Sequence, residues 1–259
     1  MIRNIFERIG ERVSRSWAWL GGLWRMLVAT ARVGPRLPLG ISDISYQTLA
    51  LGIRSLAMAS VLSLFVGMIC AWQFGEALKV FGATSALGYA AALANVRELV
   101  PALLAVTVGA KISTGVTAEL GSMKVTEQID AIGSLGADPI KKLVWPRMVA
   151  AMITMPALTV WGNILALIGG MFVAENVFNV PGEYFYETYI DELIPQYYTT
   201  GLIKALAFGL VVGIIGCYQG FQTGFGTEAV GKSTTETVVA CAMAVILVDF
   251  VLTTVLIPV

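Results

Sequence analysis

Long stretches without charged side chains dominate the hydropathy pattern of this chain. Three of these stretches carry no charge, a fourth is interrupted only by Asp249, and a fifth only by Arg97, Glu98 and Lys111. In chain order the five stretches cover residues 55–75, 88–118, 149–174, 205–227 and 237–259. The hydrocarbon core of a bilayer requires about 20 apolar residues of helix. The pattern therefore predicts an all-α membrane protein with about five transmembrane helices.

The first 40 residues have a different pattern, typical of an amphipathic helix. Apolar residues recur at steps of three and four, and three arginines lie off this stripe. The stripe consists of Ile2, Ile5, Ile9, Val13, Trp17, Leu20, Trp24 and Leu27, and the arginines are Arg8, Arg12 and Arg15. We expect this helix to lie in the cytoplasmic interface of the membrane, or alternatively to pack against the spans. A Gly- and Pro-rich segment at 34–40 should end it, which gives an interfacial helix with its linker at 1–40 and one transmembrane domain at 41–259.

Charged residues outside the spans are distributed asymmetrically, and this predicts the orientation. Seven arginines precede the first span, and four basic residues lie between the second and third spans, namely Lys124, Lys141, Lys142 and Arg147. The loop at about 175–197 instead contains five acidic residues and no Lys or Arg. Because basic residues in short loops mark the cytoplasmic side, we expect a cytoplasmic N-terminus and an outside C-terminus.

Composition argues against catalysis by this chain. Only 13% of its residues are charged, against about a quarter in soluble domains, and 17 basic residues balance 17 acidic ones, so nothing indicates binding to nucleic acid. The absence of histidine removes the commonest metal ligand and general base. Cys70, Cys217 and Cys241 each lie alone in an apolar run, so we interpret them as packing residues. We therefore expect a non-catalytic protein with no metal or cofactor of its own.

Four ionisable residues are predicted to lie at a similar depth inside the membrane. With about 1.5 Å of rise per residue, Arg97 and Glu98 lie roughly 15 Å from the outer end of their span, Lys204 roughly 10 Å and Asp249 roughly 15 Å. Their formal charges cancel, so they can form one buried network. This network suits an amphipathic substrate with a charged headgroup, or it is a structural cluster of ion pairs that fixes helix register. Lys111 lies nearer the cytoplasmic end, where its ammonium can extend to the interface.

Glycines and prolines within the spans indicate close packing and local distortion. The fourth span has Gly209, Gly213, Gly216 and Gly220 at GxxxG spacings, which favour close helix contact within the subunit or across a dimer. Pro101 and Pro156 are expected to weaken or kink their helices.

The cytoplasmic segment between the second and third spans contains a short amphipathic pattern. Met123, Ile129 and Ile132 alternate with three charged residues, Lys124, Glu127 and Asp130, and Thr126 is a candidate cap. This segment suits the docking of a soluble partner, although an ordinary surface loop has the same appearance.

Three longer motifs stand out along the second span and the segment that follows it. They are Asn95-Val-Arg-Glu-Leu-Val-Pro101, Thr117-Ala-Glu-Leu-Gly-Ser-Met-Lys-Val-Thr-Glu-Gln-Ile-Asp-Ala131, and Gly136-Ala-Asp-Pro-Ile140 followed by Pro146-Arg147. Together they resemble the MlaE/YrbE permease family of Mla and Mce lipid ABC transporters. Members often carry a small-Gly-Arg-x-Gly stretch where this chain reads Gly-Ala-Lys111-Ile-Ser. Lysine keeps the charge but lacks the guanidinium fork, so the family's role for that position is not carried over.

The resemblance implies a homodimeric permease in a bacterial inner membrane, with the C-terminus in the periplasm. It implies a cytoplasmic ABC ATPase that uses ATP and Mg, a periplasmic MCE-domain protein, and a small cytoplasmic STAS-domain protein as partners. It places phospholipid near Arg97, Glu98, Lys204 and Asp249. It also makes 119–135 the coupling helix, with Glu119, Lys124, Glu127 and Asp130 as candidate residues for ATPase coupling.

Two other functions and one misleading motif need comparison with this interpretation. An ion-coupled secondary transporter or channel for an amphipathic substrate is the alternative, although the internal repeats common in such transporters are not visible. A lipid-modifying enzyme is disfavoured because no nucleophile has a placed base. Residues 226–233 match the letters of a phosphate-binding GxxxxGK[ST] loop, but they follow a predicted membrane helix where a P-loop follows a β-strand.

Overall fold

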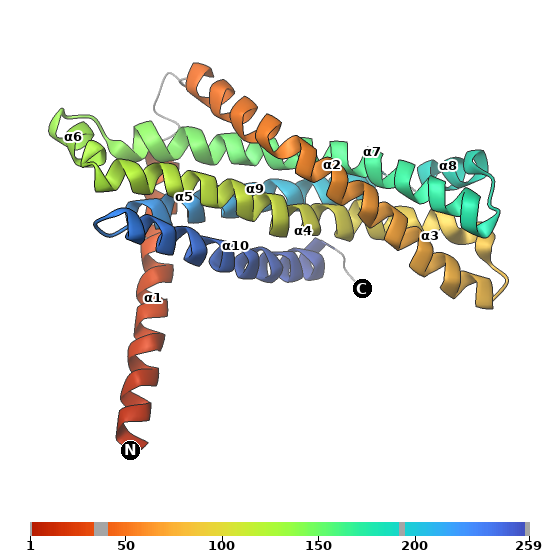
Figure 1. Cartoon of the computed structure of the whole chain (residues 1–259), viewed down its shortest axis with the longest axis horizontal. Coiled ribbons are helices and arrows are strands. Elements are labelled where there is room, and N and C mark those ends of the chain that lie inside the picture. Colours follow the sequence, from red (N-terminus) through yellow and green to blue (C-terminus); the bar gives the residue numbers. More distant parts are fainter. Residues whose placement is uncertain (1, 34–40, 192–194, 257–259) are drawn as a thin grey trace.

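The computed structural model describes residues 2–33, 41–191 and 195–256, and all regular structure in them is helical. The helices form an elongated bundle, with α6 at one end and α8 at the other (Figure 1). We refer to these as the α6 end and the α8 end. The elements are α1 (Ile2–Val33), α2 (Ile41–Val80), a 3-10 turn (Thr84–Ala86), α3 (Leu87–Ala94), the π-helical turn η3 (Asn95–Leu99), α4 (Val100–Leu104), the π-helical turn η4 (Ala105–Gly109), α5 (Ala110–Val125), α6 (Gln128–Ser134), the π-helical turn η5 (Ile140–Val144), α7 (Trp145–Phe178), α8 (Gly182–Asp191), α9 (Pro195–Phe221) and α10 (Thr227–Leu256).

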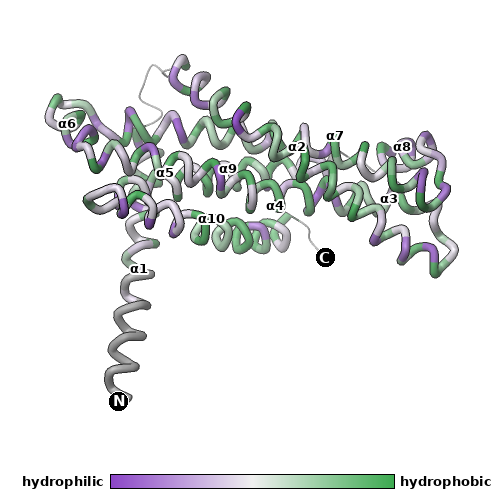
Figure 2. The backbone as a smooth tube through the Cα atoms, in the orientation of Figure 1, coloured by the Kyte–Doolittle hydropathy of each residue, from purple (hydrophilic) through white to green (hydrophobic). Residues whose placement is uncertain are grey.

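Five helical segments are long and apolar enough to cross a membrane, which confirms the predicted fold class. They are Ile41–Val80, Thr84–Val125, Ile140–Phe178, Tyr197–Phe221 and Thr227–Leu256. The helices extend beyond the charge-free stretches, because turns of polar residues continue them past the apolar part. Hydrophobic residues cover much of the bundle, as expected where lipid is the solvent (Figure 2). The predicted break at 34–40 lies outside the described residues.

Helix α1 crosses the bundle almost at right angles to the spans, near the α6 end (Figure 1). It packs through Trp19, whose indole Nε1 donates to Gln219 at 3.0 Å and whose ring meets Tyr218 edge-on. Part of the predicted stripe is left open on another face: Trp17 is 71% exposed and Trp24 is 64% exposed. The helix therefore packs on the spans through one face and retains an exposed apolar face. The side chains of Arg8, Arg12 and Arg15 are outside the described set.

Two of the three π-helical turns come directly before a proline. Proline has no N–H and its ring clashes with the carbonyl of residue i−4. Pro101 therefore cannot continue the α-helical ladder, and at the end of η3 the N–H of Val100 bonds the carbonyl of Asn95, five residues back. The turn η5 precedes Pro146 in the same way. Pro156, in contrast, lies inside the continuous helix α7.

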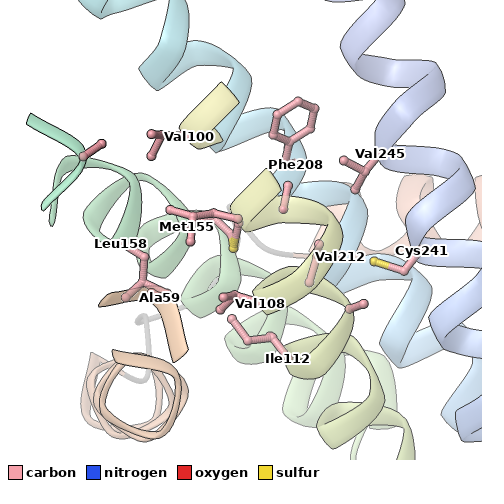
Figure 3. Packing of buried hydrophobic residues seen from close by; sticks show 14 residues of the cluster. Ala59, Val100, Val108, Ile112, Met155, Leu158, Phe208, Val212, Cys241 and Val245 are labelled. Atoms are coloured by element: carbon pink, nitrogen blue, oxygen red, sulfur yellow. The ribbon is translucent and has the colours of Figure 1, made fainter. Parts of the chain in front are cut away.

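The core is formed where α2, α4, α7, α9 and α10 meet. Figure 3 shows Val100, Met155, Phe208, Val212 and Val245 directed toward one another from four of these helices. The three cysteines are buried and unpaired, in line with the interpretation as packing residues.

The glycines of α9 allow it to lie in close contact with two neighbours. A Cβ on Gly209 would lie 2.6 Å from the carbonyl oxygen of Ala151 in α7, and a Cβ on Gly216 would lie 2.7 Å from that of Ser113 in α5. Of the two alternatives for these glycines, the structure shows packing within the subunit.

Replacing Gly216 by valine should destabilise the protein. The added carbons would overlap the backbone of α5, and overpacking of this kind costs about 1–3 kcal/mol. The matched control is Gly231→Ala in α10, where nothing lies within 4 Å of an added Cβ. We expect a lower midpoint of thermal unfolding in detergent for the first variant only, and equal midpoints would contradict the close contact.

Candidate functional site

The candidate site is built around the ammonium group of Lys204, which is completely buried on α9. Its Nζ donates to Glu98 Oε2 of η3 and to Thr253 Oγ1 of α10, the latter at 2.7 Å, and lies 3.1 Å from Asp249 Oδ1. The Thr253 hydroxyl in turn donates to the Asp249 carbonyl at 2.8 Å. A buried ammonium thus receives two carboxylates and a hydroxyl from two other helices, which compensates for its lost hydration.

Arg97, Glu98 and Asp249 are the partly exposed charged members of this cluster, at 21%, 32% and 23%. Arg97 Nε lies 3.6 Å from Glu98 Oε1, too far for a hydrogen bond. These two atoms and Asp249 Oδ1 are buried and have no hydrogen-bond partner among the described residues. The guanidinium of Arg97 also lies over the ring of Tyr197, 5.8 Å from its centroid. The cluster therefore retains one donor and two acceptors without hydrogen-bond partners.

The structure brings together all four residues predicted from depth, and it adds two. Arg97 and Glu98 lie in η3, and π-helical turns occur frequently at functional sites. Thr253 and Tyr197 were missed by sequence reasoning. Thr253 had one weak signal, its place one helical turn after Asp249 on the same face, whereas no pattern indicated Tyr197. We call Arg97, Glu98, Lys204, Asp249 and Thr253 the charge cluster.

Comparison with known proteins assigns the family. Residues 44–255 match the family described as Permease MlaE. The chain belongs to the MlaE permease family. This confirms the resemblance drawn from the sequence motifs, and it makes the chain an ABC transporter permease subunit that spans the membrane several times.

Similar proteins occur in bacteria and plants. A probable ABC transporter permease protein of Rickettsia felis is 33% identical over 253 residues, which cover 98% of both chains. A probable ABC transporter permease protein of Synechocystis is 34% identical over 201 residues, 78% of this chain and 76% of the relative. Protein TRIGALACTOSYLDIACYLGLYCEROL 1, chloroplastic, of Arabidopsis thaliana is 32% identical over 201 residues, 78% of this chain and 57% of the relative.

The segment of this MlaE permease that was expected to form one coupling helix is divided in two. Helix α5 continues to Val125, so Glu119 and Lys124 belong to its last turns, and α6 begins only at Gln128. Between them Thr126 ends α5, and Glu127 adopts a left-handed conformation with φ of 59° as the N-cap of α6. Thr126, expected as a cap, is the C-cap of α5.

The charged residues of this segment differ in their partners. Glu119 Oε1 accepts from the nearly buried guanidinium of Arg147 at 2.6 Å, which ties α5 to α7. Lys124 donates to both oxygens of Asp130 at 3.0 Å, which holds α6 against the end of α5. Both connections are local structural contacts. Glu127 and Asp130 remain exposed at the α6 end, where a soluble partner can reach them.

The P-loop-like letters at 226–233 do not form a phosphate-binding loop in this permease. Gly231, Lys232 and Ser233 lie inside α10, and the preceding element is the helix α9. In a P-loop the backbone N–H groups face the phosphates, whereas inside a helix such groups bond carbonyls of the preceding turn. Among the described residues there is also no group of carboxylates and cysteines arranged to hold a metal ion.

Removing both carboxylates from Lys204 should strongly destabilise the protein. The double variant Glu98→Ala with Asp249→Ala leaves an unpaired buried ammonium, a change that costs about 3–5 kcal/mol. Adding Lys204→Met to the same variant removes the stranded charge and should restore most of the loss. Unfolding of purified protein in detergent measures both effects. A triple variant as unstable as the double one would show that the cluster does not act through charge compensation.

Proposed function

We propose that this MlaE-family chain is the membrane subunit of an ABC transporter that moves phospholipid across or out of a bacterial inner membrane. The observation that carries the proposal is the charge cluster, which brings two positive and two negative side chains together in an apolar bundle, with Arg97, Glu98 and Asp249 partly exposed and Lys204 buried. A phospholipid headgroup is polar and attached to long apolar chains. The cluster suits the headgroup, and the surrounding helix surfaces suit the acyl chains.

The geometry also indicates which end of the cluster receives the headgroup. Lys204 already donates to Glu98 and Thr253, whereas Arg97 Nε, Glu98 Oε1 and Asp249 Oδ1 have no hydrogen-bond partner among the described residues. We infer that Arg97 and Glu98 contact the headgroup, and that Lys204, Asp249 and Thr253 hold Glu98 in place. The Arabidopsis relative is named after trigalactosyldiacylglycerol, which is a lipid, and this supports a lipid as cargo.

The proposed orientation places the α6 end in the cytoplasm and the α8 end in the periplasm. Lys124, Lys141 and Lys142 lie at the α6 end, whereas α8 contains Glu183, Glu187 and Asp191 and no basic residue. This distribution agrees with the excess of basic residues in cytoplasmic loops. The exposed face of α1 would then lie in the cytoplasmic interface, with Trp17 and Trp24 directed toward the lipid.

The proposed partners follow from this orientation. A cytoplasmic ABC ATPase, which uses ATP and Mg, would dock at the α6 end, accompanied by a small STAS-domain protein. A periplasmic MCE-domain protein would receive or deliver lipid at the α8 end. A second copy of the chain would pack along α10, since only 11% of the apolar window of that helix is buried within one subunit. A surface this open in a spanning helix is available to another copy.

Replacing Glu98 or Asp249 singly by alanine should reduce lipid transport while leaving the ATPase bound. Each single variant leaves Lys204 with one carboxylate, so the protein should still fold, but the polar patch loses its neutrality. We expect transport between reconstituted vesicles to fall about tenfold or more, the effect of losing one charge-assisted hydrogen bond. The control is Glu187→Ala on the exposed face of α8. Normal transport in both variants would count against the patch.

Reversing the charge of Asp130 should weaken docking of the ATPase. The variant Asp130→Lys inverts an exposed charge at the α6 end and also breaks the ion pair with Lys124. The double variant Lys124→Asp with Asp130→Lys restores the pair in reverse. If the ATPase recognises surface charge, both variants should retain less ATPase in co-purification, whereas Glu228→Lys at the start of α10 should retain all of it. Full retention by the Asp130→Lys variant would contradict docking at α6.

A further inference from the structure

Two exposed cationic residues, Arg54 on α2 and Lys111 on α5, occupy neighbouring positions apart from the charge cluster. Lys111 of α5 is exposed and its Nζ donates to the backbone carbonyl of Arg54 in α2 at 2.6 Å. The side chain of Arg54 is also exposed. Lys111 therefore does not simply extend along its own helix toward the interface. It bridges to a second helix at a position that carries another positive charge.

Neither of these cations has an anionic partner among the described residues. The salt bridges there involve Arg97, Lys124, Arg147 and Lys204 but neither Arg54 nor Lys111. Lys111 uses one of its three donors on the Arg54 carbonyl, and the Arg54 guanidinium has five donors with no bond to the described part of the chain. Two uncompensated charges within membrane-spanning helices are costly unless they reach an anion.

The depth of this pair can be derived from α9, which runs parallel to α5. Gly22 of α1 lies against Tyr218, and Gly216 lies against Ser113. Lys111 comes two residues before Ser113, and Tyr218 comes two residues after Gly216. Four residues, or about 6 Å along the axis, therefore separate Lys111 from the level at which α1 crosses. The pair therefore lies close to the level at which α1 crosses, and in the proposed orientation this level is the headgroup layer.

Lys111 lies well apart from the charge cluster along the same helical segment. Thirteen residues, about 20 Å, separate Glu98 from Lys111. At 3.6 residues per turn this spacing places the two side chains on different faces, and the π-helical turn η4 between them changes the angle by only about one residue. The Arg54 and Lys111 pair is therefore separate from the charge cluster both in depth and in direction.

We propose that Arg54 and Lys111 form a second anion site, which holds the phosphodiester of a phospholipid in the leaflet near the α6 end. It would be separate from the charge cluster, about 20 Å away along the axis. The proposal deepens the proposed function and rests on it in taking the lipid to be the cargo.

A phosphodiester fits these two side chains, whereas a neutral headgroup offers them no charge to pair with. Arginine and lysine both bind phosphate oxygens, arginine through its planar fork and lysine as a point charge. The phosphodiester is also the anion that every phospholipid brings to this depth. The apolar surface toward Thr107 and Leu103 then lies on the side where the acyl chains extend into the membrane.

Photocrosslinking of the full chain tests the site directly. The protein is placed in phosphatidylcholine nanodiscs that contain phosphatidylglycerol with a diazirine in its headgroup, and the labelled peptides are mapped by mass spectrometry. We expect two labelled regions, one at the charge cluster and one around Arg54 and Lys111. The variant Arg54→Gln with Lys111→Gln should lower labelling of the second region about tenfold and leave the first unchanged, which shows that the variant is folded.

Two controls and a competitor make the result specific. Lys111→Arg keeps the charge and should keep the label, and Lys79→Gln removes an exposed cation at the opposite end of α2 and should change nothing. Millimolar inorganic phosphate should not displace the lipid label. Displacement would assign the site to a free anion and overturn the lipid assignment.

The outcomes separate this proposal from the one on which it rests. Label at the charge cluster alone, or undiminished label in the double glutamine variant, would overturn the second site and leave the proposed function intact. No label in either region would count against lipid as the cargo altogether.

Discussion

The ammonium group of Lys204 sets the strongest constraint on this structure. It is completely buried between helices that face lipid, and a charge in such a place must be compensated by groups from neighbouring helices. The compensation comes from Glu98 and Asp249, which lie on different helices, and from Thr253. Helix α10, which buries little apolar surface within the subunit, is therefore held at its far end by polar contacts. The same contacts leave Arg97 Nε and Glu98 Oε1 without a hydrogen-bond partner among the described residues.

Close packing of α9 makes this polar cluster possible. Its glycines let backbone meet backbone on two sides, Gly209 against α7 and Gly216 against α5, so α9 lies at the centre of the bundle. Lys204 is buried because it lies on this central helix. In the proposed function, the helical span Thr84–Val125 connects the cluster with the α6 end, so a force applied at α6 acts along the same span that carries Glu98. The π-helical turns in that helix are the places where it departs from regular geometry.

Much of the fold and part of the site could be predicted from residue order alone. Charge-free stretches of membrane length indicated the five spans, and counting residues from their ends placed Arg97, Glu98, Lys204 and Asp249 at one depth. Depth depends only on position along the helix axis, and a constant rise per residue makes it proportional to residue number. The direction in which each side chain faces depends on helix packing and cannot be obtained by counting residues, so Tyr197 and Thr253 were missed. The segment at 119–135 was expected to be one helix and is divided in two, because Glu127 adopts a left-handed conformation that no residue pattern indicated.

The sequence by itself determined that this protein lies in a membrane, how many spans it has and at what depth its intramembrane charges lie. These properties follow from composition and spacing, since hydrocarbon excludes unpaired backbone groups and tolerates few charges. Only the tertiary structure decided which charges meet. It surrounded the Lys204 ammonium with Glu98, Asp249 and Thr253. It left Arg97 Nε and Glu98 Oε1 without hydrogen-bond partners among the described residues. It also joined Lys111 to the backbone of Arg54, fifty-seven residues away. Such pairings depend on helix rotation and close approach, which arise from the packing of all the helices together.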